Sequence, residues 1–205
     1  MASAREKNNP NAAQLASEFQ KVITDFQKTE LCHQVKFMAR KLFQSRQVNK
    51  IVAYGLSFLS CMGVGHEITI NRQVQHAALL AIRDAWKEKH KGSFEIYLQD
   101  PQYLKIDEEV AQKFGMTVVN GDLGHQMSYL LIDDDTLVVD LMKSGSVAPL
   151  IFEITRPAGF LTICPLIGEE VGFIYEPEVI FSYKLTVHNK ERGQKEEIIY
   201  PGLGV

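Results

Sequence analysis

Apolar residues in the first part of the chain recur at the spacing of amphipathic helices. Within residues 11–46 they fall every three or four positions, with a break near Thr29. These positions are Leu15, Phe19, Val22, Ile23 and Phe26, followed by Leu31, Val35, Met38 and Leu42. The spacing predicts one long helix or two consecutive helices that pack one face on a core. The same face could instead bind a partner protein.

Short apolar runs alternate with helical segments over residues 50–165. The predicted strands are 51–54, 94–98, 116–119, 136–141 and 160–163. The predicted helices are 71–89, with Asn71 as the N-cap, 107–114 and 149–154. Alternating strands and helices joined by short links favour a three-layer, mostly parallel, doubly wound (Rossmann-like) α/β sheet.

Both ends of the chain differ from this middle part. Residues 1–10 are polar and are predicted to be a disordered tail. Apolar and polar positions alternate over 179–187, and 198–200 is apolar again after a polar stretch, which predicts an antiparallel hairpin. We therefore expect a single domain over residues 11–205. It comprises N-terminal helices (11–46), an α/β core (50–165) and a C-terminal hairpin region (166–205).

Composition narrows the classes of protein to consider. The 205 residues are 45% hydrophobic and carry a formal net charge of -3, so we expect one sizeable core and no basic surface for nucleic acid. No apolar run approaches the ~20 residues that span a bilayer, and the first residues do not resemble a signal peptide. Three widely spaced cysteines (Cys32, Cys61 and Cys164) do not form a disulfide framework. We expect an intracellular protein, in the cytoplasm or the nucleus, that binds neither nucleic acid nor membrane.

A candidate ligand site lies where the first two predicted strands end. A glycine follows the first strand and Asp100 follows the second, and in open α/β sheets ligands bind outside the carboxyl ends of strands. His76 falls in the early turns of the intervening helix, whose N-terminus should face that glycine. The candidate ligand-binding residues are Tyr54, Gly55, Ser57, His76 and Asp100.

Each of these residues also has a structural interpretation. Pro101 forces the residue before it out of the helical region, so Asp100 could simply end the strand and cap a turn. His76 could be a core or capping histidine. The G-x-G-x-x-G fingerprint is absent, because Leu56 and Ser57 follow Gly55. A nucleotide-type ligand (S-adenosylmethionine or a dinucleotide), another small ligand and a purely structural turn all remain open.

Other chemistry has weaker signals. His66 and His125 lie beside glycines in predicted loops without metal-ligand spacing, so we expect no metal site. Cys164 precedes Pro165 in a Cys-Pro dipeptide, the type invoked for regulatory heme contacts, and axial thiolate ligation is chemically sound. Heme at Cys164 is therefore a speculative candidate. No G-x-S-x-G elbow is present, and no catalytic residue can be named.

Several segments together resemble the Sensitivity to Red Light Reduced (SRR-like) domain family, most closely its fungal branch. They are KIVAYGL at 50–56, QHAAL at 75–79, QDPQY at 99–103, DDDTLVV at 133–139 and RPA at 156–158. The resemblance covers about residues 50–165. It implies a regulatory rather than an enzymatic protein, linked to circadian and light signalling or to control of heme biosynthesis.

The chain departs from the family pattern at two places. Ser57 stands where the family has a second glycine, and a missing glycine restricts close approach of the backbone to a ligand. The Pro-His-Cys set of plant and animal members is replaced by LMKS at 141–144. The first hypothesis is accordingly a non-catalytic regulatory module with a small ligand. The alternatives are a Rossmann-like enzyme that uses S-adenosylmethionine or a dinucleotide, and a scaffold that binds partners through its N-terminal helices.

Overall fold

The computed structural model describes the backbone of residues 11–60, 66–119, 127–141, 147–162, 173–175, 182–189 and 194–201. The helices are α1 (Ala12–Phe26), α2 (Glu30–Ser45), α3 (His66–Lys87), α4 (Lys105–Lys113), the 3-10 helix η2 (Met127–Leu131) and α5 (Ala148–Ile154). The strands are β1 (Lys50–Tyr54), β2 (Glu95–Gln99), β3 (Thr117–Val118), β4 (Thr136–Asp140), β5 (Gly159–Thr162), β6 (Phe173–Tyr175), β7 (Ser182–Asn189) and β8 (Gln194–Pro201). Within this part of the chain, no helix combines the length and the apolarity needed to cross a bilayer.

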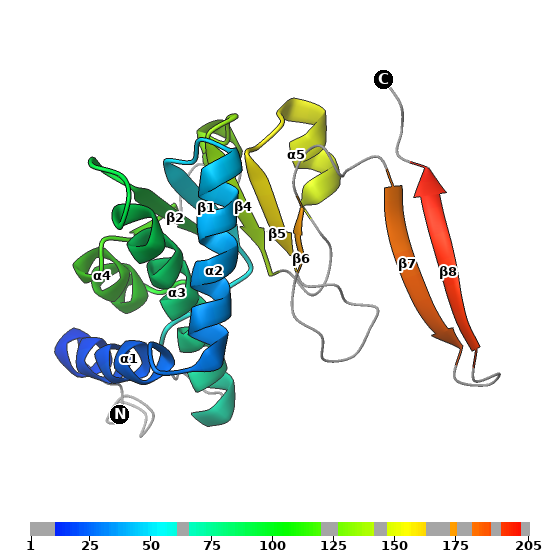
Figure 1. Cartoon of the computed structure of the whole chain (residues 1–205). Helices are drawn as coiled ribbons and strands as arrows, with labels where there is room; N and C mark the ends of the chain where they lie inside the picture. The colour runs from blue at the N-terminus through cyan, green and yellow to red at the C-terminus, as the bar shows by residue number, and fades with distance from the viewer. Residues whose placement is uncertain are drawn as a thin grey trace.

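The main sheet confirms the predicted doubly wound α/β fold. Its strand order is β3-β2-β1-β4-β5-β6, in which the first five strands run parallel and β6 is antiparallel to β5. The chain reverses its direction of winding between β1 and β4, so this pair marks the topological switch point of the sheet (Figure 1). β7 and β8 pair antiparallel in a separate sheet, as the alternating pattern near the C-terminus predicts.

One face of the sheet is covered by α1, α2, α3 and α4. Alternate residues of the central strands point to it, because successive side chains in a strand face opposite sides. They are Ile51 and Ala53 of β1, Ile96 and Leu98 of β2, and Leu137 and Val139 of β4. In Figure 1, α2 and α3 run side by side along this face, and α1 crosses near their lower ends. We call it the helical face.

The opposite face is covered by η2 and α5. Val52 and Tyr54 of β1 point to it and pack with residues of β4, β5, η2 and α5. We call it the Tyr54 face. Together the two covered faces make the three layers that the sequence predicts.

The break between the first two helices is a helix cap. α1 begins at Asn11, whose side chain accepts a hydrogen bond from the Gln14 backbone, and Thr29 accepts one from the Cys32 backbone at 3.2 Å to start α2. Of the two predicted alternatives, the structure shows two consecutive helices rather than one long one. Most of their apolar residues lie in the main core, including Leu15, Phe19 and Leu42, but Leu31, which the spacing places with them, is exposed.

The acidic turn before β4 is tied to the start of β1. Lys50 and Asp133 form an ion pair of 2.7 Å, and the Asp135 carboxylate accepts hydrogen bonds from Gln47 and Asn49. These contacts bring the amino ends of β1 and β4 together and help to set the register in which Lys50 lies beside Thr136.

Two features differ from the sequence-based expectation. α3 begins at His66, so Asn71 lies inside the helix rather than capping it. A cap preference is a local bias worth about 1 kcal/mol, which a longer helix can override. The sequence pattern also failed to indicate η2 and the short strand β6, since a three-residue edge strand forms only by pairing with β5.

Substitutions at two phenylalanines test whether α1 belongs to the core. Phe19 is fully buried, with its ring 4.8 Å from that of Phe114, whereas Phe37 on α2 is 55% exposed. Phe19→Ala should lower the free energy of unfolding by about 3–5 kcal/mol, measured by urea denaturation. The matched variant Phe37→Ala should change it by less than about 1 kcal/mol. Equal effects of the two substitutions would show that α1 is not packed as described.

Candidate functional site

The last residues of three neighbouring strands form a polar row at the carboxyl edge of the sheet. Tyr54 of β1 lies in register with Gln99 of β2 on one side and with Asp140 of β4 on the other. Residues in register on parallel strands point to the same face, so all three side chains lie on the Tyr54 face. The row spans the switch point between β1 and β4, where open α/β sheets place their ligands.

The loop that follows β1 has an unusual backbone. Gly55 adopts φ 73°, which glycine accepts readily, but Ser57 also adopts a positive φ of 62°. A non-glycine residue in this region is strained by about 1–2 kcal/mol. Hydrogen bonds hold Ser57 in place: its backbone N–H donates to Asp100 Oδ2 at 2.8 Å, and its hydroxyl donates to Gln102 Oε1 at 2.5 Å.

Two buried aspartates after β2 satisfy the backbone of this loop. Asp100 accepts from the Ser57 N–H through Oδ2 and from the Gln102 N–H through Oδ1, at 2.8 and 2.9 Å. Asp107 Oδ1 accepts from the Leu59 and Ser60 N–H groups at 3.1 and 2.8 Å. Its Oδ2 accepts from the Leu104 N–H at 2.8 Å, which starts α4.

These carboxylates change what the loop can bind. In phosphate-binding loops the backbone N–H groups point at the anion. Here the N–H groups of Ser57, Leu59 and Ser60 already donate to internal carboxylates. A phosphate at this position would have to displace Asp100 or Asp107, and the loop is therefore built as a self-satisfied turn.

His76 is fully buried on the helical face, and both of its ring nitrogens are engaged. Nδ1 lies 2.7 Å from the Arg72 carbonyl oxygen, and Nε2 lies 2.7 Å from the Tyr103 hydroxyl. A carbonyl can only accept, so Nδ1 carries the proton and Nε2 accepts from Tyr103. Burial lowers the pKa of His76 to about 4, which keeps the ring neutral.

A second group of polar side chains is buried without partners. Buried polar atoms without a hydrogen bond to any residue that the structure describes include the Tyr54 hydroxyl, both polar atoms of the Gln99 amide and the Ser128 hydroxyl. The others belong to Ser60, Arg72 and Arg83. The Tyr54 and Ser128 hydroxyls approach one another, and the Tyr54 ring stacks on Tyr129 with centroids 5.5 Å apart. We call Tyr54, Gln99, Ser128 and Tyr129 the switch-point cluster.

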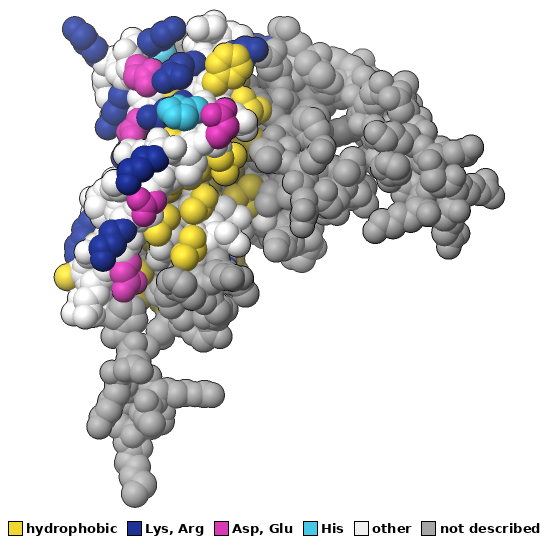
Figure 2. Space-filling view, turned by 60° about the horizontal axis from the view of Figure 1, so that its bottom comes forward, with side chains coloured by type: hydrophobic (Ala, Val, Ile, Leu, Met, Phe, Trp, Pro, Cys, Tyr) yellow, Lys and Arg dark blue, Asp and Glu magenta, His cyan; other side chains and the backbone are white. Residues whose placement is uncertain are grey.

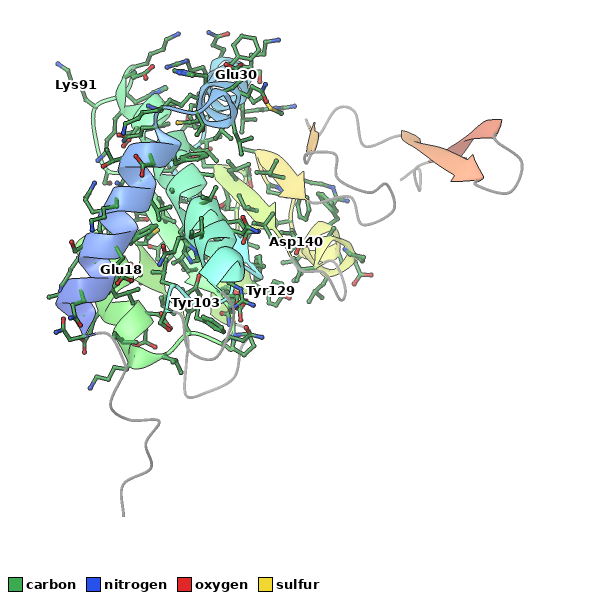
Figure 3. All side chains as sticks on the ribbon, turned by 90° about the horizontal axis from the view of Figure 1, so that it is seen from below. Glu18, Glu30, Lys91, Tyr103, Tyr129 and Asp140 are labelled. Carbon is green, nitrogen blue, oxygen red and sulfur yellow. The ribbon has the colours of Figure 1, made fainter. Side chains whose placement is uncertain are left out.

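Asp140 borders this cluster. Its Oδ2 accepts from the Val147 N–H at 2.9 Å, which anchors the start of α5. Figure 3 shows Tyr129 and Asp140 beside one another and away from α1, which carries Glu18. Burial, and to a smaller extent the Asp140 charge, raises the pKa of Tyr54 and of Tyr129. Both hydroxyls are therefore protonated at neutral pH and able to donate.

The five residues suggested by the sequence thus occupy three different environments. Gly55, Ser57 and Asp100 lie together in the loop after β1. Tyr54 points to the opposite face from His76, which packs against Phe19 and Tyr103 in the helical layer. A ligand role for any of the five stays a prediction.

Sequence reasoning missed Gln99, Ser128, Tyr129 and Asp140. Gln99 and Asp140 each close an apolar strand with a polar residue, the same signal that singled out Asp100. Ser128 and Tyr129 carry no such signal, because they lie on a short 3-10 helix that the pattern does not indicate.

Metal and heme candidates fall mostly outside the part of the chain described. Among the side chains that the structure describes, no three His, Cys, Asp or Glu come together in a way that could hold a metal ion. His125, Cys164 and the side chain of His66 lie outside those residues. Cys32 is buried, and its burial raises the pKa of its thiol, as in an unreactive core cysteine.

Comparison with known proteins supplies one match. A family model described as the SRR1 domain matches residues 15–142, which is more than half of the chain. This region includes α1 and α2, which the resemblance at 50–165 leaves out. No curated protein and no solved structure matches the chain.

Substitutions at Ser57 test the strained turn. Ser57→Gly removes the backbone strain together with one hydrogen bond, so the free energy of unfolding should change by less than about 1 kcal/mol. Ser57→Val places a β-branched side chain at positive φ and should lower it by at least about 2 kcal/mol. Chemical denaturation measures both. If valine is tolerated as well as glycine, the positive φ at Ser57 is wrong.

The buried His76 should make stability depend on pH. Its pKa is about 4 in the fold and 6.5 when unfolded, so the unfolded chain binds more protons between these values. The stabilisation is complete above pH 6.5 and is lost as pH falls toward 4, by up to about 3 kcal/mol. Urea denaturation across this range should show a steeper fall in wild type than in His76→Gln. An NMR titration of the ring with a midpoint near 6.5 would contradict the burial.

Proposed function

Because the chain belongs to the SRR1 domain family, we propose that it is a non-catalytic regulatory protein that binds a small ligand at the carboxyl edge of its sheet. The observation that carries this proposal is the switch-point cluster. Buried polar groups without partners are rare in native proteins, and each is expected to have a reason. Three of the side chains that carry such groups, Tyr54, Gln99 and Ser128, gather where open α/β sheets bind ligands.

The chemistry of the edge favours binding over catalysis. A general base must be able to exchange a proton near the operating pH. The pKa of His76 is held at about 4 and its ring nitrogens are engaged, while the pKa of Tyr54 is raised by burial. Amide and hydroxyl groups of the switch-point cluster can position a ligand without reacting with it.

The regulatory role comes from the family resemblance. We infer a link to circadian and light signalling or to control of heme biosynthesis, in an intracellular location that is cytoplasmic or nuclear. A heme contact at Cys164 is the corresponding cofactor hypothesis. It predicts that a hemin-induced thermal shift is lost in Cys164→Ser.

A second candidate is an enzyme that uses S-adenosylmethionine or a dinucleotide. The strand order 3-2-1-4-5 of the parallel strands favours it, because this is the order of the Rossmann fold. The loop after β1 argues against it, since Asp100 and Asp107 hold the N–H groups that a pyrophosphate would need.

A scaffold that binds partners through α1 and α2 would have less apolar helix surface available than the sequence suggests. The apolar faces of both helices lie in the core, so a partner would contact the remaining surface, where Leu31 and Phe37 are exposed. Figure 2 shows one face of the molecule on which Lys, Arg, Asp and Glu intermingle beside a row of hydrophobic side chains. Binding to a face of this kind stays an alternative proposal.

A thermal-shift panel tests the ligand site. It contains S-adenosylmethionine, S-adenosylhomocysteine, NAD(H), NADP(H), nucleosides and hemin. A ligand at about 100 times its Kd should add about 2.7 kcal/mol to the free energy of unfolding. Tyr54→Phe removes a buried hydroxyl whose contact with the Ser128 hydroxyl is too poor in geometry to count as a hydrogen bond, and it keeps the ring. It should therefore retain the apo Tm and lose most of the ligand-induced shift.

Tyr97→Phe is the matched control. Tyr97 of β2 lies on the Tyr54 face, in register with Val52 and away from the carboxyl edge. Loss of the Tyr97 hydroxyl should therefore leave the ligand-induced shift intact. An unchanged shift in Tyr54→Phe would move the ligand elsewhere on the protein. If no compound of the panel shifts the Tm, small-ligand binding is rejected in favour of the scaffold.

A further inference from the structure

We propose that the Gln99 carboxamide is the specificity group of this site, and that it takes an uncharged, planar ligand edge with a hydrogen-bond donor next to an acceptor, as in a nucleobase. This inference deepens the proposed function and rests on a small ligand binding at the carboxyl edge. It names the chemical class that the site accepts and the residue that reads it.

The first observation is the state of the Gln99 side chain. Gln99 is the last residue of β2 and is 6% exposed, yet neither its Oε1 nor its Nε2 has a partner among the described residues. An amide offers one acceptor and two donors on a rigid plane. Leaving such a group buried and unpaired destabilises the fold, so the arrangement is unfavourable unless another molecule completes it.

The second observation is what surrounds Gln99. Tyr54 is its register neighbour on β1, and the buried Tyr54 and Ser128 hydroxyls have no partner among the described residues beyond their contact with one another. The stacked rings of Tyr54 and Tyr129 stand beside these groups. Aromatic faces and a few convergent polar groups are the usual lining of a small-molecule site. A planar heterocycle would meet both kinds of contact here.

The charge of the ligand follows from the groups available. The amide and the hydroxyls of the switch-point cluster are neutral, and the bordering Asp140 carboxylate, which would repel an anion, already accepts from the Val147 N–H. A bidentate amide contact matches the donor–acceptor pair on a base edge. Phosphate groups would find the N–H groups of Ser57, Leu59 and Ser60 already bound to Asp100 and Asp107. The site is therefore matched to a base or a nucleoside rather than to its phosphates.

The first arm of the test compares two buried glutamines in the full chain without ligand. Gln73 on α3 is also buried, but its Nε2 donates to the Leu59 carbonyl at 3.0 Å. Gln73→Leu should lower the Tm. Gln99→Leu should leave the Tm unchanged or raise it by about 2–4 °C, because it removes an unpaired amide. A fall in Tm as large as that of Gln73→Leu would show that the Gln99 amide is satisfied in the apo protein, and would overturn the inference.

The second arm measures ligand class by calorimetry. The probes are adenosine, guanosine, cytidine and uridine, each compared with its 5′-monophosphate. At least one nucleoside should bind wild type, its Kd should weaken at least tenfold in Gln99→Leu, and the monophosphate should bind no tighter. Equal affinity for wild type and Gln99→Leu, or tighter binding of the monophosphate, would overturn the inference.

These results distinguish the nucleobase-like ligand class from the ligand site itself. A panel compound that depends on Tyr54, with no nucleoside bound, would leave the ligand site standing and reject the nucleobase-like class. Absence of any Tyr54-dependent ligand would reject the proposed function itself. Binding of a nucleoside that Gln99→Leu weakens and Gln73→Leu does not would support both.

Discussion

The architecture of the carboxyl edge depends on two buried carboxylates that follow β2. Asp100 and Asp107 reach across to the loop after β1 and accept hydrogen bonds from the backbone of Ser57, Leu59 and Ser60. A loop buried among helices would otherwise leave these N–H groups unsatisfied, at a cost of about 1–3 kcal/mol each. The same two side chains hold Ser57 at positive φ and start α4 through the Leu104 N–H. Strand exit, loop and helix start are therefore one hydrogen-bonded unit.

The two faces of the sheet bury different polar groups. On the helical face, His76 and Tyr103 satisfy one another, although Arg72 and Arg83 of α3 each keep one buried nitrogen without a partner among the described residues. On the Tyr54 face, the amide of Gln99 and the hydroxyls of Tyr54 and Ser128 remain unpaired among the described residues. A protein selected for stability alone would replace such groups with apolar side chains, and functional sites are where local rules are usually broken. The grouping of three such side chains at one strand edge directs attention to the switch point.

The family match defines which part of the chain forms the domain, and the geometry restricts which ligands could bind to it. The SRR1 domain match over 15–142 takes in α1, α2 and the sheet through β4, so the N-terminal helices belong to the matched family region as well as to the core. It does not specify a ligand. The geometry restricts the charge of a ligand. Internal carboxylates already occupy the N–H groups of the loop after β1, whereas the neutral Gln99 amide, near Tyr54 and Tyr129, has no partner among the described residues. The uncharged ligand proposed above is compatible with both the family match and the geometry.

Sequence alone determined the main helices and strands, though not η2 and β6, because these elements depend mostly on neighbours within a few residues. The spacing from Leu15 to Leu42 predicted α1 and α2, and short apolar runs predicted the five parallel strands. It also pointed to the strand ends at Tyr54 and Asp100. Only the tertiary structure decided the order of the strands, the start of α3 and the grouping of Gln99 with Tyr54, Ser128 and Asp140. Whether a polar atom is satisfied depends on partners such as Asp100 for Ser57, which lies 43 residues away along the chain, and no local pattern records such a pairing.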